Sequence, residues 1–143
     1  MGLEGRGYEP YLPTYRRRRR WSDRIVETDQ VLFPGYLFCR FDVTKQFPII
    51  TTPGVASIVS FGSEPAVVED HEIEAVQGVL SSGLLSEPHP FLREGQRIVI
   101  KQGPLRDLEG ILLRKKSDLR LVVSVSMLQR SVSVEIEPAW LAA

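Results

Sequence analysis

The stretch LRLVVSVSMLQRSVSVEI, residues 119–136, decides the fold of this chain. Apolar residues occupy every second position from Leu119 to Met127 and again from Val132 to Ile136. Alternate positions are taken by Ser124, Ser126, Ser131, Ser133 and Glu135. This period of two predicts two antiparallel strands, each with one face in a core and the other in solvent.

The same alternation begins upstream of this stretch. Ile98 with Ile100, and Ile111 with Leu113, predict further short strands, so that residues 93–143 contain four or five of them. A small barrel closes such strands without long unpaired edges. We expect a stable β-barrel over residues 93–143 that never becomes helical, because Val and Ser are poor helix formers, and that is independent of the first domain.

The barrel is preceded by a predicted linker over residues 83–92, where Ser, Gly and two prolines follow a helical pattern. That helix is expected to begin near Asp70 as its N-cap and to stop at Gly83. Residues 1–82 then form the first domain, and its strands are predicted at Tyr8–Tyr15, Arg24–Leu32, Tyr36–Asp42 and Val55–Phe61, with a short helix between Asp42 and Pro53.

Composition narrows the class of protein. The chain has 143 residues, of which 43% are hydrophobic, and its 18 basic residues balance 18 acidic ones, which argues against a globally basic nucleic-acid coat. A single cysteine, Cys39, and the absence of a Cys/His cluster favour a reducing cytoplasm and argue against a metal site. His71 and His89 are isolated, so we expect no enzyme, no cofactor and no small-molecule substrate. No apolar stretch is long enough for a membrane span.

The densest charge feature is the run Arg16, Arg17, Arg18, Arg19 and Arg20, followed by Trp21. At the tip of a hairpin these arginines would form a positive finger for phosphates, and Trp21 would offer a surface for base stacking. The alternative is a solvated, self-repelling hairpin tip.

A second feature is the stretch LFPGYLFCRF, residues 32–41. Alternation places Tyr36 and Phe38 on one face of a strand and Leu37 and Cys39 on the other, so both faces are largely apolar. Either a partner docks on one face, or both faces are internal.

A third feature is a predicted tight loop between two barrel strands. It contains Gly103, Pro104 and Leu105 and ends at Gly110. Glycine and proline suit such a loop, and a plain structural turn accounts for the glycines equally well.

Together these segments resemble the NusG family of transcription elongation factors, in particular its RfaH-like paralogues. The resemblance implies an α+β, ferredoxin-like NGN domain followed by an SH3-like KOW barrel whose loop contains Gly103, Pro104, Leu105 and Gly110. It also implies that Phe33, Pro34, Tyr36 and Phe38 form an apolar patch for the clamp helices of RNA polymerase, and that Thr51 and Thr52 touch the opposite side of the polymerase cleft.

The chain departs from the family pattern in three places. Ile50 stands where the RfaH branch has a histidine, and Asp107 replaces a small residue of the KOW loop. The family's first strand and most of its first helix are missing, because the chain passes almost directly from Met1–Gly7 into the second strand. We expect either a start codon assigned too far downstream or a truncated paralogue.

The resemblance implies a cytoplasmic transcription elongation or antitermination factor. The first domain would bind RNA polymerase across its cleft and suppress pausing or termination, and the barrel would recruit a small-subunit ribosomal protein or Rho. Nucleic-acid contact through the arginines would be secondary. The alternative is a ribosome- or RNA-associated KOW module without a polymerase role.

Overall fold

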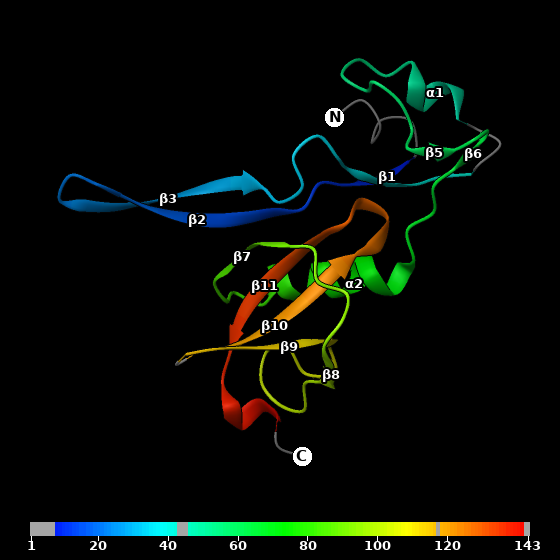
Figure 1. Ribbon diagram of the computed structural model, residues 1–143. Coiled ribbons are helices and arrows are strands. Elements are labelled where there is room, and N and C mark those ends of the chain that lie inside the picture. Colours follow the sequence, from blue (N-terminus) through cyan, green and yellow to red (C-terminus); the bar gives the residue numbers. More distant parts are fainter. Residues whose placement is uncertain (1–7, 43–45, 117, 142–143) are drawn as a thin grey trace. The chain divides into compact units, whose positions relative to one another are not determined.

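The computed structural model describes residues 8–42, 46–116 and 118–141, and Met1–Gly7 lie outside them (Figure 1). The chain divides into two compact units. One contains the described residues up to Leu12 together with Gly35–Val67, and the other contains Pro13–Pro34 together with Val68 onward. Each unit is built from antiparallel strands and one α-helix, and the larger unit adds the short 3-10 helices η2 (Ser126–Leu128) and η3 (Pro138–Leu141), which makes the chain a mixed α/β protein.

The larger unit is organised around a five-stranded antiparallel sheet of order β7-β11-β10-β9-β8. Its strands are β7 (Ser86–Pro90), β8 (Gln96–Val99), β9 (Glu109–Lys115), β10 (Asp118–Val125) and β11 (Arg130–Ile136). The central strand β10 pairs with its neighbour β11 along its length, from Leu119 opposite Ile136 to Val125 opposite Arg130. The strands predicted from the alternating pattern are therefore confirmed.

One face of this sheet forms the core of the unit. Leu121, Val125, Val132 and Val134 are fully buried on it, as the period of two predicts. The expectation that the opposite face is solvated is wrong in its centre, because Ser131 and Ser133 are also buried.

The Ser133 hydroxyl accepts a hydrogen bond from Arg120 Nη1 at 3.4 Å, and Ser131 is satisfied by the chain that follows β7. The hydroxyls of Ser124 and Ser131 lie 2.6 Å apart, Ser124 Oγ donates to the carbonyl of Leu92, and the Leu92 amide donates to Ser131 Oγ. A sequence pattern does not show this cover, because it comes from a segment about 30 residues away in the chain.

The predicted linker over residues 83–92 differs in the structure, since Ser86–Pro90 form strand β7. This strand pairs with β11, with Ser86 opposite Val134 and Pro90 opposite Arg130. Arg120 on β10 fixes it further, because its Nη1 lies 2.8 Å from Glu87 Oε1. Two prolines fit this strand because it is at the edge of the sheet, where one side of the backbone needs no partner.

The helix α2 (Asp70–Ser81) packs on the same sheet. Val76 and Val79 are fully buried on its apolar face, and Glu72 accepts hydrogen bonds from the amide and hydroxyl of Ser126. The helix begins one residue after Glu69, which makes Asp70 its first residue instead of its N-cap. The helix thus buries its apolar face against β10, and the independence of residues 93–143 from the preceding chain stays a prediction.

The remaining strands form two-stranded pairs, and the described residues contain no larger ferredoxin-like sheet. In the larger unit, β2 (Thr14–Trp21) and β3 (Arg24–Val31) form a long hairpin. In the smaller unit, β1 (Glu9–Tyr11) pairs with β4 (Phe38–Arg40), and β5 (Ser60–Phe61) pairs with β6 (Glu64–Pro65). The predicted strand Tyr8–Tyr15 is divided between β1 and β2 at Leu12–Pro13, and the predicted strand Val55–Phe61 is reduced to β5.

The smaller unit also contains the short helix α1 (Phe47–Ile50), in the interval where the sequence predicts one. No helix of the described part of the chain is long and apolar enough to cross a membrane.

Candidate binding surfaces

The hairpin of β2 and β3 carries all five consecutive arginines. They lie along the strand β2, and the turn at its end consists of Ser22 and Asp23. The arginines therefore lie on a strand that leads to the tip of the hairpin and do not form its turn. Ser22 adopts a positive φ of 54°, which allows a two-residue turn, so the strand can continue through the arginines to Trp21.

The register sorts the hairpin into two faces, since directly opposite residues of an antiparallel pair share a face. Arg16 lies opposite Asp29 and Arg18 opposite Glu27, so these four residues share what we call the paired face. The other face, which we call the open face, carries Arg17, Arg19, Trp21 and Arg24.

The paired face is a ladder of ion pairs. Glu27 accepts from Arg16 Nη1 at 3.1 Å and from Arg18 Nε at 3.0 Å, and Arg16 Nε lies 3.4 Å from Asp29. The hydrogen bonds from Arg16 and Arg18 lower the pKa of the Glu27 carboxyl below its ordinary value. Two of the five arginines are therefore neutralised by their own hairpin.

The lowered pKa of Glu27 gives a direct test of this ladder. Because the folded-state pKa is lowered, the ion pairs stabilise the hairpin above the ordinary pKa of glutamate and are lost as the pH falls through the lowered value. We expect Arg16→Gln to raise the pKa of Glu27, measured by carboxyl ¹³C NMR, and Arg17→Gln on the open face to leave it unchanged. An equal response to both substitutions would contradict the register.

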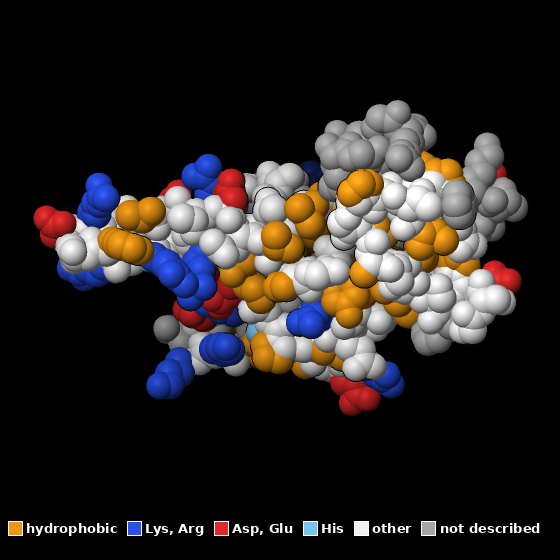
Figure 2. All heavy atoms as spheres, turned by 90° about the horizontal axis from the view of Figure 1, so that it is seen from above, with side chains coloured by type: hydrophobic (Ala, Val, Ile, Leu, Met, Phe, Trp, Pro, Cys, Tyr) orange, Lys and Arg blue, Asp and Glu red, His pale blue; other side chains and the backbone are white. Residues whose placement is uncertain are grey.

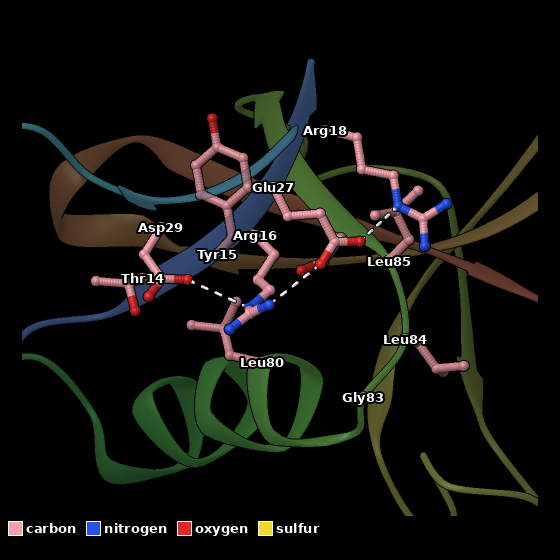
Figure 3. Close-up of a pocket in the computed structure, with 11 residues that line it drawn as sticks. Thr14, Tyr15, Arg16, Arg18, Glu27, Asp29, Leu80, Gly83, Leu84 and Leu85 are labelled. Atoms are coloured by element: carbon pink, nitrogen blue, oxygen red, sulfur yellow. Dashed lines mark hydrogen bonds and ion pairs between the residues drawn. The ribbon is translucent and has the colours of Figure 1, made fainter. Parts of the chain in front are cut away.

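The paired face also lines a cavity of about 390 Å³ in the larger unit (Figure 3). Arg16, Arg18, Glu27 and Asp29 form one wall of this cavity. The end of α2 and the chain leading into β7 form the other, through Leu80, Gly83, Leu84, Leu85 and Ser86. The ion-paired face of the hairpin is thus turned toward its own unit.

The open face has a different character. Within the described part of the chain, the side chains of Arg17, Arg19 and Arg24 make no ion pair or hydrogen bond, and no acidic residue of β2 or β3 shares their face. Trp21 is 61% exposed. Figure 2 shows Lys and Arg side chains along the hairpin with apolar side chains between them near its free end.

The aromatic strand β4 is more internal than a docking surface requires. Phe38 is only 8% exposed and stacks on Tyr11 of β1 with ring centroids 6.4 Å apart, and burial raises the pKa of the Tyr11 hydroxyl. Tyr36 is half-buried and Leu37 is exposed. Of the expected polymerase patch in this unit, Tyr36 is the member that a partner can reach.

The other residues expected to contact polymerase also divide into accessible and buried ones. Phe33 is buried and Pro34 is exposed, both in the larger unit. In the smaller unit, Thr51 is exposed, whereas Thr52 is 4% exposed and donates its hydroxyl to the carbonyl of Pro48 at 2.8 Å. Thr52 is thus committed to the end of α1.

The loop between β8 and β9 is held tightly at both ends. Ile100 and Leu108 bond through their backbones, the Asp107 amide donates back to the carbonyl of Ile100, and Leu105 is buried. Gly103 and Asp107 adopt positive φ values of 86° and 72°. Asp107 thus occupies a left-handed backbone position, which aspartate tolerates better than most residues.

The remaining candidate residues are isolated. Cys39 is half-buried, and burial, with the charge of Glu9 as a smaller cause, raises the pKa of its thiol, which makes it a poor nucleophile. His71 is exposed and lies beside Glu69. In the described ranges, no three His, Cys, Asp or Glu residues are grouped as a metal ion would require.

Sequence reasoning missed two residues that shape the hairpin surface and did not include a third, Arg24, among the binding residues. Glu27 and Asp29 neutralise one face, and Arg24 extends the positive charge of the other. The signal was present in the period of two along Arg24–Val31, because the acidic residues occupy alternate positions of that strand. Assigning these acidic residues to the face of Arg16 and Arg18 required the register of the hairpin.

These features define a mixed α/β protein with a basic hairpin and a two-stranded aromatic sheet whose Phe38 is buried. The model of the family described as "Transcription termination factor nusG" matches residues 2–77, more than half of the chain. The chain belongs to the NusG family.

Curated relatives agree with this assignment over most of the chain. The chain is 24% identical to the transcription termination/antitermination protein NusG of Thermus thermophilus, across 96% of this chain and 81% of that protein. It is also 24% identical to the protein of the same name from Pseudomonas aeruginosa, across 95% of this chain and 80% of that protein. The NusG of Borreliella burgdorferi is 29% identical across 83% of this chain and 70% of that protein.

Proposed function

We propose that this protein is a cytoplasmic transcription elongation or antitermination factor that binds RNA polymerase across its cleft and suppresses pausing or termination. The observation that carries the proposal is the family match over residues 2–77, together with relatives named for termination and antitermination. The proposed mechanism is a population shift, in which a factor that binds the closed cleft more tightly than the opened one disfavours the paused state. It needs no catalytic residue or cofactor.

In this proposal, residues 1–82 act as a ferredoxin-like NGN domain of the RfaH-like type, joined through residues 83–92 to an SH3-like KOW barrel over residues 93–143. The polymerase patch includes Phe33, Pro34, Tyr36 and Phe38, with Thr51 and Thr52 for the opposite side of the cleft. Burial divides these roles: exposed or half-buried members contact the partner, and the buried Phe33, Phe38 and Thr52 support them.

The barrel is proposed to recruit a second partner, either a small-subunit ribosomal protein or Rho. The well-ordered loop at Gly103, Pro104, Leu105 and Gly110 supports a fixed surface there, because its glycines allow close backbone approach and Leu105 anchors it in the core. The basic hairpin supplies an additional nucleic-acid contact.

Tyr36→Ala tests the polymerase proposal. If the tyrosine ring is an interface anchor, its loss should cost about 2 kcal/mol, or roughly a 30-fold weaker affinity for core RNA polymerase. The measurement is titration of a fluorescently labelled protein with the core enzyme.

The matched control is Val67→Ala, which removes another apolar side chain of the same unit that is 71% exposed. We expect this control to bind like the parent protein. Equal affinities of Tyr36→Ala and the parent, with both folded, would remove Tyr36 from the interface.

The second candidate function is a ribosome- or RNA-associated module without a polymerase role, favoured by the strength of the basic hairpin. Co-purification separates the two. Polymerase subunits in the eluate support the first candidate, and ribosomal RNA without polymerase supports the second.

A further inference from the structure

We propose that the β2–β3 hairpin binds single-stranded nucleic acid through its open face alone. In this assignment Arg17, Arg19 and Arg24 hold phosphates and Trp21 stacks on an unpaired base. The inference deepens the proposed nucleic-acid contact of the hairpin and rests on it, but it does not depend on polymerase binding.

The first argument is the distribution of charge between the faces. The paired face carries Arg16, Arg18 and Arg20 against Glu27 and Asp29, a net charge of +1, whereas the open face carries three arginines and no acidic residue, a net charge of +3. A polyanion gains most from cations that are not already neutralised, because it must otherwise displace an existing carboxylate.

The second argument is accessibility. The paired face lines a cavity within its own unit, and its arginine forks are occupied by Glu27 and Asp29 at 3.0–3.4 Å (Figure 3). Tyr15, at the base of the open face, also lines that cavity, whereas Arg17, Arg19, Trp21 and Arg24 do not. The open face can therefore receive a ligand without rearrangement of the hairpin.

The third argument selects a single strand over a duplex. Trp21 is 61% exposed. It shares the open face with Arg19, two residues earlier on β2, and with Arg24, directly opposite on β3. An indole ring stacks on bases that are not already stacked in a helix, and aromatic rings interleaved with cations are typical of single-strand binding surfaces. Residues two apart on one face are about 7 Å from each other, which spreads the arginines along a backbone.

The experiment compares two double variants of equal charge change. Arg17→Gln with Arg19→Gln removes two cations from the open face, and Arg16→Gln with Arg18→Gln removes two from the paired face. Binding of a fluorescein-labelled deoxythymidine oligomer of about 12 nucleotides is followed by anisotropy at several salt concentrations.

We expect the open-face variant to bind at least about tenfold more weakly and its salt slope to fall by about 1.4, because two phosphate contacts are lost. The paired-face variant should keep a slope close to that of the parent. Equal losses in both variants would overturn the assignment to one face while leaving nucleic-acid binding intact. Failure of the parent protein to bind the oligomer would overturn the hairpin contact itself, without bearing on the polymerase affinity measured with Tyr36→Ala.

Trp21 separates stacking from charge. Trp21→Ala should weaken binding of the oligomer about tenfold with no change of salt slope, and Trp21→Phe should recover most of the loss. The same oligomer annealed to its complement should bind the parent more weakly and should not respond to Trp21→Ala. Tighter binding of the duplex, or an equal response of both probes to Trp21→Ala, would contradict the single-strand assignment.

Discussion

Phe38→Ala is expected to destabilise the smaller unit by about 3–5 kcal/mol, the cost of removing a buried aromatic ring from a core. Phe38 is 8% exposed and stacks on Tyr11 across the β1–β4 pair, so its removal leaves a cavity beneath a sheet of only two strands. The measurement is the midpoint of urea unfolding, with the amide hydrogen exchange of Cys39 and Arg40 as the probe of the smaller unit. Any loss of polymerase affinity in this variant would follow from unfolding.

The control for Phe38 is its neighbour Leu37, which is 36% exposed and points to the other face of the strand. Leu37→Ala should cost less than about 1 kcal/mol, because surface substitutions have small effects. If Phe38→Ala unfolds at the same urea concentration as the parent while weakening polymerase binding, Phe38 is an interface anchor and our assignment to the core is wrong.

Gly110→Ala is expected to destabilise the five-stranded sheet by about 2–3 kcal/mol through overpacking. A Cβ at this position would lie 2.7 Å from the carbonyl oxygen of Val122 and 2.8 Å from a methyl carbon of Leu121. The Val122 oxygen belongs to the backbone of the central strand β10, so the strand itself must shift. The measurement is the change in the free energy of unfolding, followed by the fluorescence of Trp140 in a Trp21→Phe background.

Gly78→Ala is the matched control for Gly110. Its new Cβ would meet only the side chain of Leu108, at 3.1 Å, and a flexible side chain can move where a backbone cannot. Alanine also favours the helix by up to about 1 kcal/mol relative to glycine. We expect Gly78→Ala to be close to neutral, and a Gly110→Ala protein as stable as this control would refute the close approach of β9 and β10.

Elements with a strong local signal could be predicted from the sequence. Strands β10 and β11 follow the period of two from Leu119 to Ile136, and α2 follows the helical spacing of Val76 and Val79. The hairpin is also predictable from the sequence. Its predicted strands leave the five arginines between them, whereas the structure places the turn at Ser22 and Asp23. A strand of arginines has no apolar periodicity, so nothing local marked its end.

The accessibility of the expected polymerase residues could not be predicted in the same way. The stretch from Leu32 to Phe41 is apolar on both faces, and the sequence left open which face is covered. The structure buries Phe38 against Tyr11 and leaves Tyr36 half-buried. Tyr11 lies 27 residues before Phe38, so their contact depends on the pairing of β1 with β4.

By itself, the sequence determined the local elements and the family, because periodicity, turn residues and motif order depend on neighbouring residues. Tertiary structure alone decided which surfaces remain available. It turned the predicted linker at Ser86–Pro90 into an edge strand, placed α2 on the sheet, and divided the arginines of β2 between ion pairs and solvent. The physical reason is that burial and charge neutralisation depend on partners distant in sequence, here Glu27 for Arg18 and Leu92 for Ser131.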